Sequence, residues 1–272
     1  FAGHDVIAWT HAAFDVREHS ATAEHIRAAR PDVVINTAAF HKTDACEDDP
    51  TLAFAVNAIA VRNLAQVCAA ISAVLVHIST DYVFGGDKSA PYTEDDRPNP
   101  INVYGASKLA GEHLAAAICP RHYIVRVASL FGAAGASGKG GNFVETMLGK
   151  ARRGEAIAVV DDVTMSPTYT VDAAVTIRGL VEAAAPFGTY HVTNAGTCSW
   201  HGFAAEIFRQ AGVAVDLRPT TIQTMASKAP RPRNSALASL RLHGSQPVPL
   251  RSWQAALEAY LGICGLLVTT PR

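Results

Sequence analysis

The chain has 272 residues, of which 49% are hydrophobic and 17% are charged, with 20 Gly and 14 Pro. This composition excludes disordered, collagen-like and low-complexity proteins and allows one large domain or two smaller ones. Because 23 Lys and Arg face 24 Asp and Glu, the net charge is -1, and no global field attracts nucleic acid or an anionic membrane. The five cysteines lack metal-ligand spacing, and no apolar run reaches the ~18 residues of a membrane helix. We therefore expect reduced thiols in a cytoplasmic protein without a nucleic-acid or membrane partner.

Short apolar runs alternate with longer segments of helical period through the first half of the chain. The runs expected to form buried strands are 5–9, 32–36, 74–78 and 123–127. The segments expected to form helices are 19–29, 51–71 and 102–118. Alternation of strands and helices at this spacing predicts βαβ units and a parallel sheet.

The second half of the chain is less regular and predicts a smaller α+β part. Its expected helices are 142–153, 172–184, 199–211 and 252–261. Five glycines in 132–141 predict a mobile connection, and the proline-rich segment 219–249 predicts irregular structure. We expect a division into 1–132 and 133–272, with segments near 156–180 returning to the first part.

Residues suited to chemistry follow one of the predicted strands and begin one of the predicted helices. In a parallel α/β sheet, ligands bind beyond the carboxyl ends of the strands. Thr80 and Asp81 come directly after the third predicted strand. Tyr104 and Lys108 are four residues apart near the start of the next helix, so they share one helix face.

These side chains together suit carbonyl reduction or alcohol oxidation. An ammonium group near a phenol favours the phenolate, so Lys108 is expected to lower the pKa of Tyr104 from its usual ~10. The hydroxyl of Thr80, brought nearby at the strand end, is expected to hydrogen-bond a carbonyl oxygen and polarise it for hydride attack. The alternative is that Tyr104 and Lys108 form a surface pair on an amphipathic helix.

With these motifs the sequence resembles the extended short-chain dehydrogenases/reductases, and within them the dTDP-4-dehydrorhamnose reductase family. The resemblance runs nearly from end to end. In the first half, its motifs are Arg30 to Asn36 with Thr37-Ala38-Ala39, Val56-Asn57, Ile78 to Gly85, Pro91-Tyr92 with Glu94, and Val103 to Glu112. In the second half, they are Asn142-Phe143-Val144 with Met147-Leu148, Ser166-Pro167-Thr168, Tyr190-His191, Ser199-Trp200 with Phe203-Ala204, and Arg231 to Ser235.

The resemblance implies an α/β fold with a doubly wound, Rossmann-like parallel sheet and a smaller α+β substrate-binding part. Residues 1–132 would then bind a dinucleotide, and residues 133–272 would mainly bind the substrate. It also implies a catalytic triad of Thr80, Tyr104 and Lys108, in which Tyr104 donates the proton and Lys108 holds the nicotinamide ribose. The implied reaction is NADPH-dependent reduction of the C4 keto group of a nucleotide-linked 4-keto-6-deoxy sugar, with dTDP-4-dehydrorhamnose as the expected substrate.

The resemblance further implies which residues contact the cofactor and the substrate. The cofactor contacts are Thr10, Asp15, Val16, Ala38, Ala39 and Phe40, together with Tyr104 and Lys108. The substrate contacts are Thr80, Asp81, Asn142, Arg231 and Arg233. The two arginines suit a diphosphate because guanidinium groups form paired hydrogen bonds with its oxygens, and the alternative for them is a solvated basic loop. Asn57 is expected to brace a helix near the cofactor.

The chain departs from the family pattern in three places. The first strand and the glycine-rich turn that holds the pyrophosphate are absent from the sequence as given. We expect them to precede it, because loss of a central strand would leave a buried sheet edge unpaired. Where an acidic residue would select NAD, the chain has Trp9-Thr10-His11, which favours NADP(H) over NAD(H). Where the family carries a Trp against the sugar, the chain has 128–131 without Trp, which leaves another nucleotide sugar open.

The histidines show no H-x-x-x-H or H-E-x-x-H spacing, so no metal site is expected, and Asp161-Asp162 is expected to form a turn. Two alternatives to the reductase stay open. One is another nucleotide-sugar epimerase or dehydratase of the superfamily, and a single Asp81 where dehydratases add an acidic pair favours reduction. The other is a regulatory subunit related to the accessory subunit of methionine adenosyltransferase, against which the intact triad argues. A homodimer is the expected assembly.

Overall fold

The first part of the protein is built on a parallel sheet. The computed structural model describes residues 3–134, 141–224, 226–242 and 250–267. The sheet has the order β1-β2-β3-β8 and consists of β1 (Val33–Asn36), β2 (Val74–Thr80), β3 (His122–Val127) and β8 (Gly188–His191). All three neighbouring pairs are parallel, so each connection crosses a face of the sheet, as helices do in α/β proteins.

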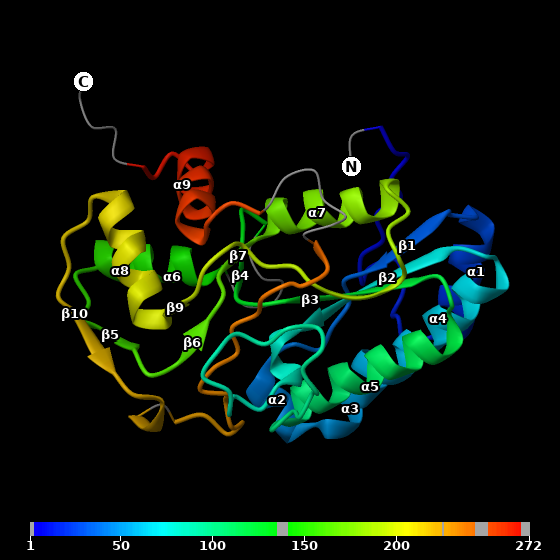
Figure 1. Ribbon diagram of the computed structural model, residues 1–272, viewed down its shortest axis with the longest axis horizontal. Helices are drawn as coiled ribbons and strands as arrows, with labels where there is room; N and C mark the ends of the chain where they lie inside the picture. The colour runs from blue at the N-terminus through cyan, green and yellow to red at the C-terminus, as the bar shows by residue number, and fades with distance from the viewer. Residues whose placement is uncertain (1–2, 135–140, 225, 243–249, 268–272) are drawn as a thin grey trace.

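Helices cover both faces of this sheet, which confirms the doubly wound α/β class. Val74 and Val76 pack in one cluster with residues of α7 (Thr170–Glu182), whereas Leu75 packs in another with residues of α4 (Ala60–Ala70) and α5 (Val103–Ile118). Successive strand side chains point to opposite faces, so a strand apolar at every position must be covered twice. Figure 1 shows α7 on one side of the sheet and α4 and α5 on the other.

The predicted helix over 51–71 is confirmed, with two additional features. It begins as α3 (Pro50–Phe54), passes through the π-helical turn η1 (Ala55–Ile59) and continues as α4. The carboxylate of Asp49 caps its start by accepting from Leu52 N at 2.8 Å. By length and apolar composition, Pro50–Ala70 would suffice to cross a membrane, but 56% of its 18-residue apolar window is buried here, as in a core helix.

The other helices of the first part lie on the same side as α4. They are α1 (His19–Ala29), which packs on α4, and α2 (Thr43–Asp48), which packs on α5 and which the periodicity does not predict. The single-turn helix η2 (Asp81–Val83) follows β2 directly.

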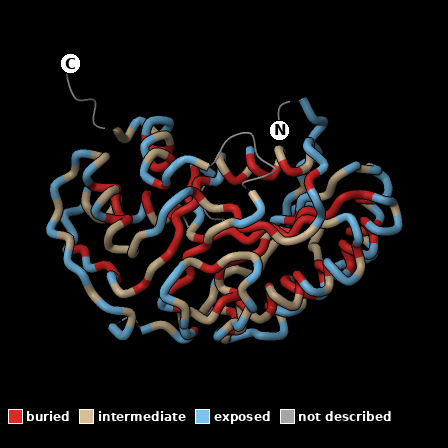
Figure 2. The backbone as a smooth tube through the Cα atoms, viewed as in Figure 1, coloured by how far each residue is buried: buried red, intermediate tan, exposed pale blue. Residues whose placement is uncertain are grey.

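The smaller second part surrounds its own aromatic core. Its helices are α6 (Phe143–Arg152), α8 (Trp200–Ala211) and α9 (Trp253–Ile263), and its main strands are the parallel pair β5 (Ile157–Val160) and β10 (Leu217–Thr220). The short strands β4 (Leu130–Phe131), β6 (Thr164–Met165), β7 (Thr168–Tyr169) and β9 (Cys198–Ser199) and the turn η3 (Ile222–Thr224) complete it. Phe131, Phe203 and Tyr260 meet in its core at ring-centroid distances of 5.5 and 5.6 Å from Phe131. Figure 2 shows buried backbone running through both parts.

The predicted strand over 5–9 is not formed. This segment has no regular structure, and Val6 and Ile7 are 60% and 56% exposed. A strand is stable only when a neighbour completes its ladder of hydrogen bonds, and among the described residues no strand pairs with 5–9 or with the outer edge of β1. Residues 5–9 therefore have the apolar pattern of a strand but no neighbouring strand to pair with among the described residues.

The expected return of segments near 156–180 to the first part involves two different elements. β5 pairs with β10 in the second part, whereas α7, which overlaps the end of that range, packs on the main sheet, and β8 then joins it. The division of the chain at 132 and 133 stays a prediction. The expected connection 132–141 and the irregular segment 219–249 lie partly outside the described residues.

Candidate active site

Thr80 lies at the carboxyl end of β2, where the strand turns into η2. Its hydroxyl oxygen accepts from Tyr82 N at 3.2 Å, and its hydroxyl donates to Asp81 Oδ1 at 3.0 Å. The first bond caps η2 and holds the Thr80 side chain at the strand end. Thr80 is 5% exposed, so it lies within the protein but still borders the surface at this edge of the sheet.

The start of α5 brings Tyr104 to this strand end. Asn102 caps the helix by accepting from Gly105 N at 2.8 Å, and its amide nitrogen donates to the carbonyl of Pro230 at 2.9 Å. The ring of Tyr104 meets the ring of Tyr82 edge-on at 5.9 Å, and its phenol hydrogen-bonds with Thr80. Residues from β2, η2 and α5 therefore converge, as their order in the sequence predicts.

The phenol of Tyr104 is protonated at neutral pH. Burial raises the pKa of Tyr104 well above its usual value, and the hydrogen bond with Thr80 opposes this only in part. The expectation that Lys108 lowers this pKa is wrong in this structure, because burial outweighs any effect of the lysine. A protonated phenol is the form that can donate a proton.

Lys108 is almost completely buried, with 1% of its surface exposed. Its Nζ donates to the carbonyl of Ile78 at 2.6 Å and lies 3.3 Å from Nε2 of His77. Burial lowers the pKa of Lys108 to about 8, and the charge of Glu112 opposes the change. The alternative of a surface pair with Tyr104 is therefore wrong, since this lysine is not at the surface.

Asp81 is a buried carboxyl group beside Thr80. Burial raises the pKa of Asp81 to about 6, while hydrogen bonds from Ser235 and Thr80 work in the opposite direction. Ser235 belongs to the segment after the two arginines, so Asp81 connects the strand end to the second half of the chain.

The segment after β1, residues 37–40, is held in place by the side-chain amides of Asn36 and Asn57. Ala38 N donates to Asn36 Oδ1 at 3.1 Å, and Phe40 exchanges two hydrogen bonds of 2.9 Å with the amide of Asn57. Asn57 also donates to Ser107 Oγ at 3.0 Å. Asn57 is fully buried at the π-helical turn and braces this loop against α5, as expected. The small side chains of Ala38 and Ala39 leave the backbone approachable.

The other expected cofactor residues lie before α1. The carboxylate of Asp15 accepts from the guanidinium of Arg17 at 2.5 Å, and this pairing lowers the pKa of Asp15 to about 2. Val16 is half-buried beside this pair, and Thr10 is exposed. The structure shows no contact between these residues and the catalytic side chains, so their role stays a prediction.

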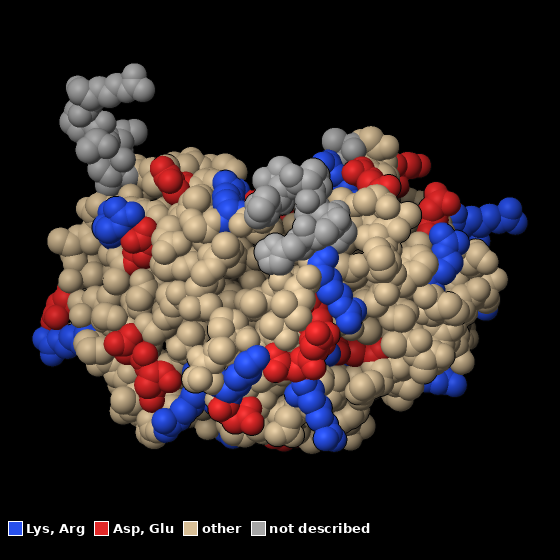
Figure 3. All heavy atoms as spheres, in the orientation of Figure 1, with Lys and Arg blue, Asp and Glu red and all other residues tan. Residues whose placement is uncertain are grey.

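The two expected diphosphate arginines differ in their surroundings. Arg231 is half-buried, donates to Asp44 Oδ1 at 3.2 Å and hydrogen-bonds with Tyr82, so it reaches the site. Its Nε is buried and has no hydrogen-bond partner within the part of the chain that the structure describes. Arg233 is exposed. Figure 3 shows basic and acidic side chains interspersed over the face in view, in line with the net charge near zero.

Asn142 has a structural task at the start of α6. Its side chain accepts from Glu145 N at 3.1 Å and forms a capping box with that residue. Its amide nitrogen donates to the carbonyl of Gly132 and to Tyr260 Oη, both at 2.9 Å. These bonds use both N–H groups of the amide. The expected contact of Asn142 with substrate stays a prediction.

Four buried polar residues below the site are not singled out by the sequence pattern. Glu112 and Arg126 form an ion pair with a shortest distance of 2.6 Å and side-chain exposures of 4% and 6%. Asn36 and His77 lie side by side in β1 and β2, 3.1 Å apart. For Asn36, His77 and Arg126 the signal in the sequence is a polar residue inside an otherwise apolar strand, whereas Glu112 lies in α5. Only the folded structure shows which buried polar residue each of them contacts.

The remaining polar clusters lie away from these residues. Asp161 accepts from Ser199 Oγ at 2.5 Å and Asp162 accepts from Ile222 N at 2.7 Å, so both carboxylates anchor loops of the second part. The described residues contain no group of three or more His, Cys, Asp or Glu that would hold a metal ion.

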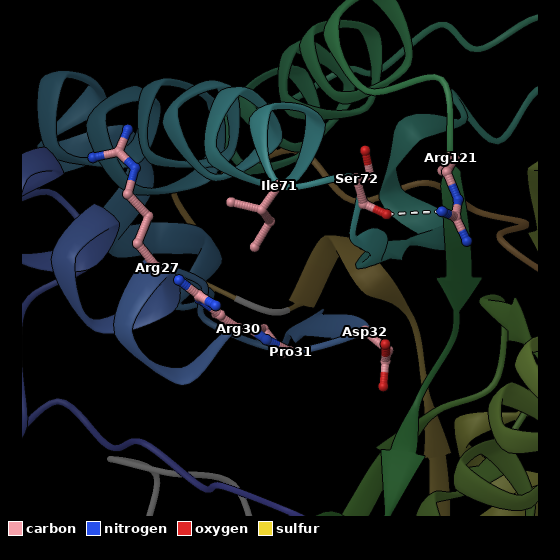
Figure 4. Close-up of a pocket in the computed structure, with 7 residues that line it drawn as sticks. All are labelled: Arg27, Arg30, Pro31, Asp32, Ile71, Ser72 and Arg121. Carbon is pink, nitrogen blue, oxygen red and sulfur yellow. Dashed lines mark hydrogen bonds between the residues drawn. The ribbon is translucent and has the colours of Figure 1, made fainter.

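One cavity lies at the opposite end of the sheet. It has a volume of about 470 Å³ and is lined by Arg27, Arg30, Pro31, Asp32, Ile71, Ser72 and Arg121 (Figure 4). These residues precede β1, β2 and β3, whereas Thr80 follows β2, so the cavity does not belong to the candidate active site.

A parallel sheet covered on both faces, with Thr80 and Tyr104 hydrogen-bonded at the carboxyl end of β2 and Lys108 bound to the same strand, defines a doubly wound α/β protein whose candidate site lies at the carboxyl edge of the sheet. Comparison with known proteins narrows this class. Residues 2–264 match the family model described as the RmlD substrate binding domain. The chain belongs to this family, whose related proteins include dTDP-4-dehydrorhamnose reductases.

Individual relatives are similar to this chain over most of their length. A dTDP-4-dehydrorhamnose reductase of Streptomyces griseus is 44% identical over 90% of this chain and 80% of its own. The solved structure of a dTDP-4-dehydrorhamnose reductase from Clostridium acetobutylicum has a TM-score of 0.91 and 36% identity, covering 97% of this chain and 92% of the other. That of the Bacillus anthracis reductase in complex with NADP has the same score and identity, covering 96% and 90%.

Proposed function

We propose that this protein reduces the C4 keto group of dTDP-4-dehydrorhamnose, with NADPH as the reductant, to give dTDP-rhamnose. The observation that carries the proposal is the hydrogen bond between Thr80 and Tyr104 at the end of β2, with Lys108 bound to the same strand at Ile78, in a chain 44% identical to a named reductase. The NADP complex of a 36% identical relative supports the choice of cofactor, and the absence of an acidic residue at Thr10 and His11 agrees with it.

The residues present fit a dinucleotide. The loop after β1 carries only small side chains at Ala38 and Ala39 and is fixed by hydrogen bonds with Asn36 and Asn57. Such a backbone suits the close approach of an extended ligand. Tyr104 and Lys108 offer a hydroxyl and an amine, the donors that ribose hydroxyls require. Bound NADPH supplies the hydride that the C4 carbon accepts.

The protein's own groups handle the oxygen and the proton. Thr80, whose hydroxyl donates to Asp81 in this structure, would turn that proton to the keto oxygen and stabilise the negative charge that develops on it. Tyr104 transfers its phenolic proton to the same oxygen, which completes the alcohol and leaves a phenolate to be reprotonated from solvent. The protonated state of Tyr104 at neutral pH supports this role.

Arg231 is the candidate ligand for the substrate diphosphate. Its unpartnered buried Nε retains hydrogen-bonding capacity beside Tyr82, and a phosphate oxygen would satisfy it. Arg233, Asp81 and Asn142 complete the proposed substrate set, and Asp15, Val16, Phe40 and Thr10 complete the proposed cofactor set. We also propose a cytoplasmic homodimer without a membrane or nucleic-acid partner, which light scattering and cell fractionation test.

The central experiment measures NADPH oxidation by the full-length protein with dTDP-4-dehydrorhamnose. Tyr104→Phe is expected to lower kcat by a factor of roughly 10² to 10⁴, as loss of a general acid does. His113→Gln, at an exposed position of the same helix, is the matched control and is expected to keep wild-type activity. Sugar turnover without net NADPH consumption would indicate an epimerase or dehydratase, and NADPH binding without turnover a regulatory subunit.

A further inference from the structure

A chain of hydrogen bonds leads from the edge strand of the sheet to the lysine of the active site. Asn36 and His77 are direct neighbours across β1 and β2 in the strand register. Asn36 Nδ2 lies 3.1 Å from His77 Nδ1, and His77 Nε2 lies 3.3 Å from Lys108 Nζ. These three side chains are 6%, 0% and 1% exposed, so solvent does not compete for their hydrogen bonds.

The main chain fixes the orientation of Asn36. Ala38 N–H donates to Asn36 Oδ1 at 3.1 Å, and a backbone N–H can only donate. The amide oxygen of Asn36 therefore faces Ala38, and the NH₂ group faces His77. A rotated amide would place two donors against each other at Ala38.

This orientation determines the tautomer of His77. Burial and the charge of Lys108 lower the pKa of His77 well below its usual range, so the ring is neutral. Because Asn36 Nδ2 donates to Nδ1, that nitrogen carries the lone pair and the proton sits on Nε2. The His77 Nε2–H group then faces Lys108.

A donor facing Lys108 disfavours its ammonium form. An ammonium group has only donors, whereas the neutral amine keeps a lone pair that can accept from Nε2–H. The other groups around the lysine act differently. The carbonyl of Ile78 accepts from either form, and Glu112, one helical turn away, favours the charged form but is itself paired with Arg126 from β3.

We propose that Asn36 and His77 are positioning residues that hold Lys108 toward its neutral amine. The pair sets the pH range over which Lys108 changes charge beside Tyr104, a task distinct from binding the ribose. Burial lowers the pKa of Lys108 to about 8, and the Nε2–H group of His77 acts in the same direction as burial. The inference concerns the lysine of the proposed reductase site and in that respect rests on the proposed function.

The first test measures the tautomer of His77 in the wild-type protein, and a substitution serves only to assign the signal. Nitrogen NMR of the full-length protein labelled with ¹⁵N-histidine distinguishes the two ring nitrogens, and His77→Phe assigns the signal. We expect a neutral ring with its proton on Nε2 from pH 6 to 8. A proton on Nδ1, or a charged ring, would overturn the proposal.

The second test reverses the tautomer. In Asn36→Asp, one carboxylate oxygen still accepts from Ala38 N–H while the other accepts from Nδ1–H, so Nε2 presents a lone pair to Lys108. NMR titration of ¹³C-labelled lysine, assigned with Lys108→Met, should show the Lys108 midpoint rising by about one pH unit, as expected for a hydrogen bond to a charged group. An unchanged midpoint would contradict the proposal.

A double variant separates the tautomer from the added charge. Asn36→Asp with His77→Phe keeps the new carboxylate but removes the imidazole, so the rise relative to His77→Phe alone should largely vanish. A rise of equal size in this background would assign the effect to charge and refute the role of His77. These readouts do not depend on turnover, so a failed reductase assay with the expected NMR result would count against the proposed function alone.

Discussion

The backbone of Gly105 rests against the carbonyl oxygen of Tyr82, so closely that a β-carbon on Gly105 would lie 2.0 Å from it. Only glycine permits such an approach. Tyr82 belongs to η2, which follows Thr80, and Gly105 follows Tyr104 in α5. This contact therefore sets the position of the phenol relative to the threonine hydroxyl.

Gly105→Ala is expected to move the start of α5 away from η2. A misplacement of about 1 Å lowers catalytic efficiency by up to roughly 10²-fold, and the overpacking destabilises the fold by about 1 to 3 kcal/mol. Steady-state kinetics and urea unfolding measure the two effects. In the control Gly149→Ala, the added carbon meets only the end of the Arg153 side chain at 3.3 Å, so activity should persist. Wild-type kinetics for Gly105→Ala would show that this contact does not position Tyr104.

Lys108→Met is expected to stabilise the protein while abolishing reduction. Because the pKa of Lys108 falls from 10.5 to about 8 on folding, its buried charge destabilises the fold below pH 8, and stability rises as pH increases from about 8 to 10.5. Removing the charge should raise the free energy of unfolding at pH 7 by on the order of 1 to 3 kcal/mol, after allowance for the lost bond to Ile78.

The gain from Lys108→Met should shrink toward pH 10, where the wild-type lysine is neutral when folded. Urea unfolding at pH 7 and pH 10 checks this sign. Lys150→Met, on α6, is the control and should show no such difference between the two pH values. A loss of stability at pH 7 in Lys108→Met would mean that the hydrogen bonds of Lys108 outweigh the effect of its burial.

Asp81→Asn tests the second buried ionisable group beside Thr80. Burial raises the pKa of Asp81 from 3.8 to about 6. The contribution of the neutral carboxyl group to the free energy of unfolding is therefore fully present below pH 3.8 and is lost as pH rises through 6. The neutral amide should therefore increase the free energy of unfolding by about 1 to 3 kcal/mol at pH 7 and by less at pH 4.5. The exposed control Asp95→Asn should respond alike at both pH values. Equal gains at both pH values in Asp81→Asn would refute the assignment.

Glu112→Gln breaks the buried ion pair with Arg126 and leaves a guanidinium without its counter-charge. The expected loss is about 3 to 5 kcal/mol of unfolding free energy. Glu112 also accepts from Ser79 Oγ, the residue before Thr80, so the variant should lower kcat as well. The double variant Glu112→Gln, Arg126→Met should recover part of the lost stability in a double-mutant cycle. Additive losses in the cycle would show that the two groups are not coupled.

The local sequence pattern determined the fold class and indicated the candidate catalytic set, whose roles stay a prediction. Apolar runs of strand length between helical segments require a sheet covered on both faces, and β1, β2 and β3 occur where the pattern predicts them. Thr80 ends a strand, and Tyr104 and Lys108 share one face of a helix by their spacing of four. These are relations between near neighbours in the chain, which backbone geometry alone sets.

Only the tertiary structure decided the protonation states and the pairing of the buried polar groups. The pattern predicts a lowered pKa for Tyr104, but burial from several elements raises it, and the same burial lowers the pKa of Lys108. Asn36 lies 41 positions before His77, and Glu112 lies 14 positions before Arg126. The segment 5–9 has a strand pattern without a partner, while β8 joins the sheet from far along the chain. Desolvation and strand pairing depend on which distant residues surround a group, and no local periodicity carries that information.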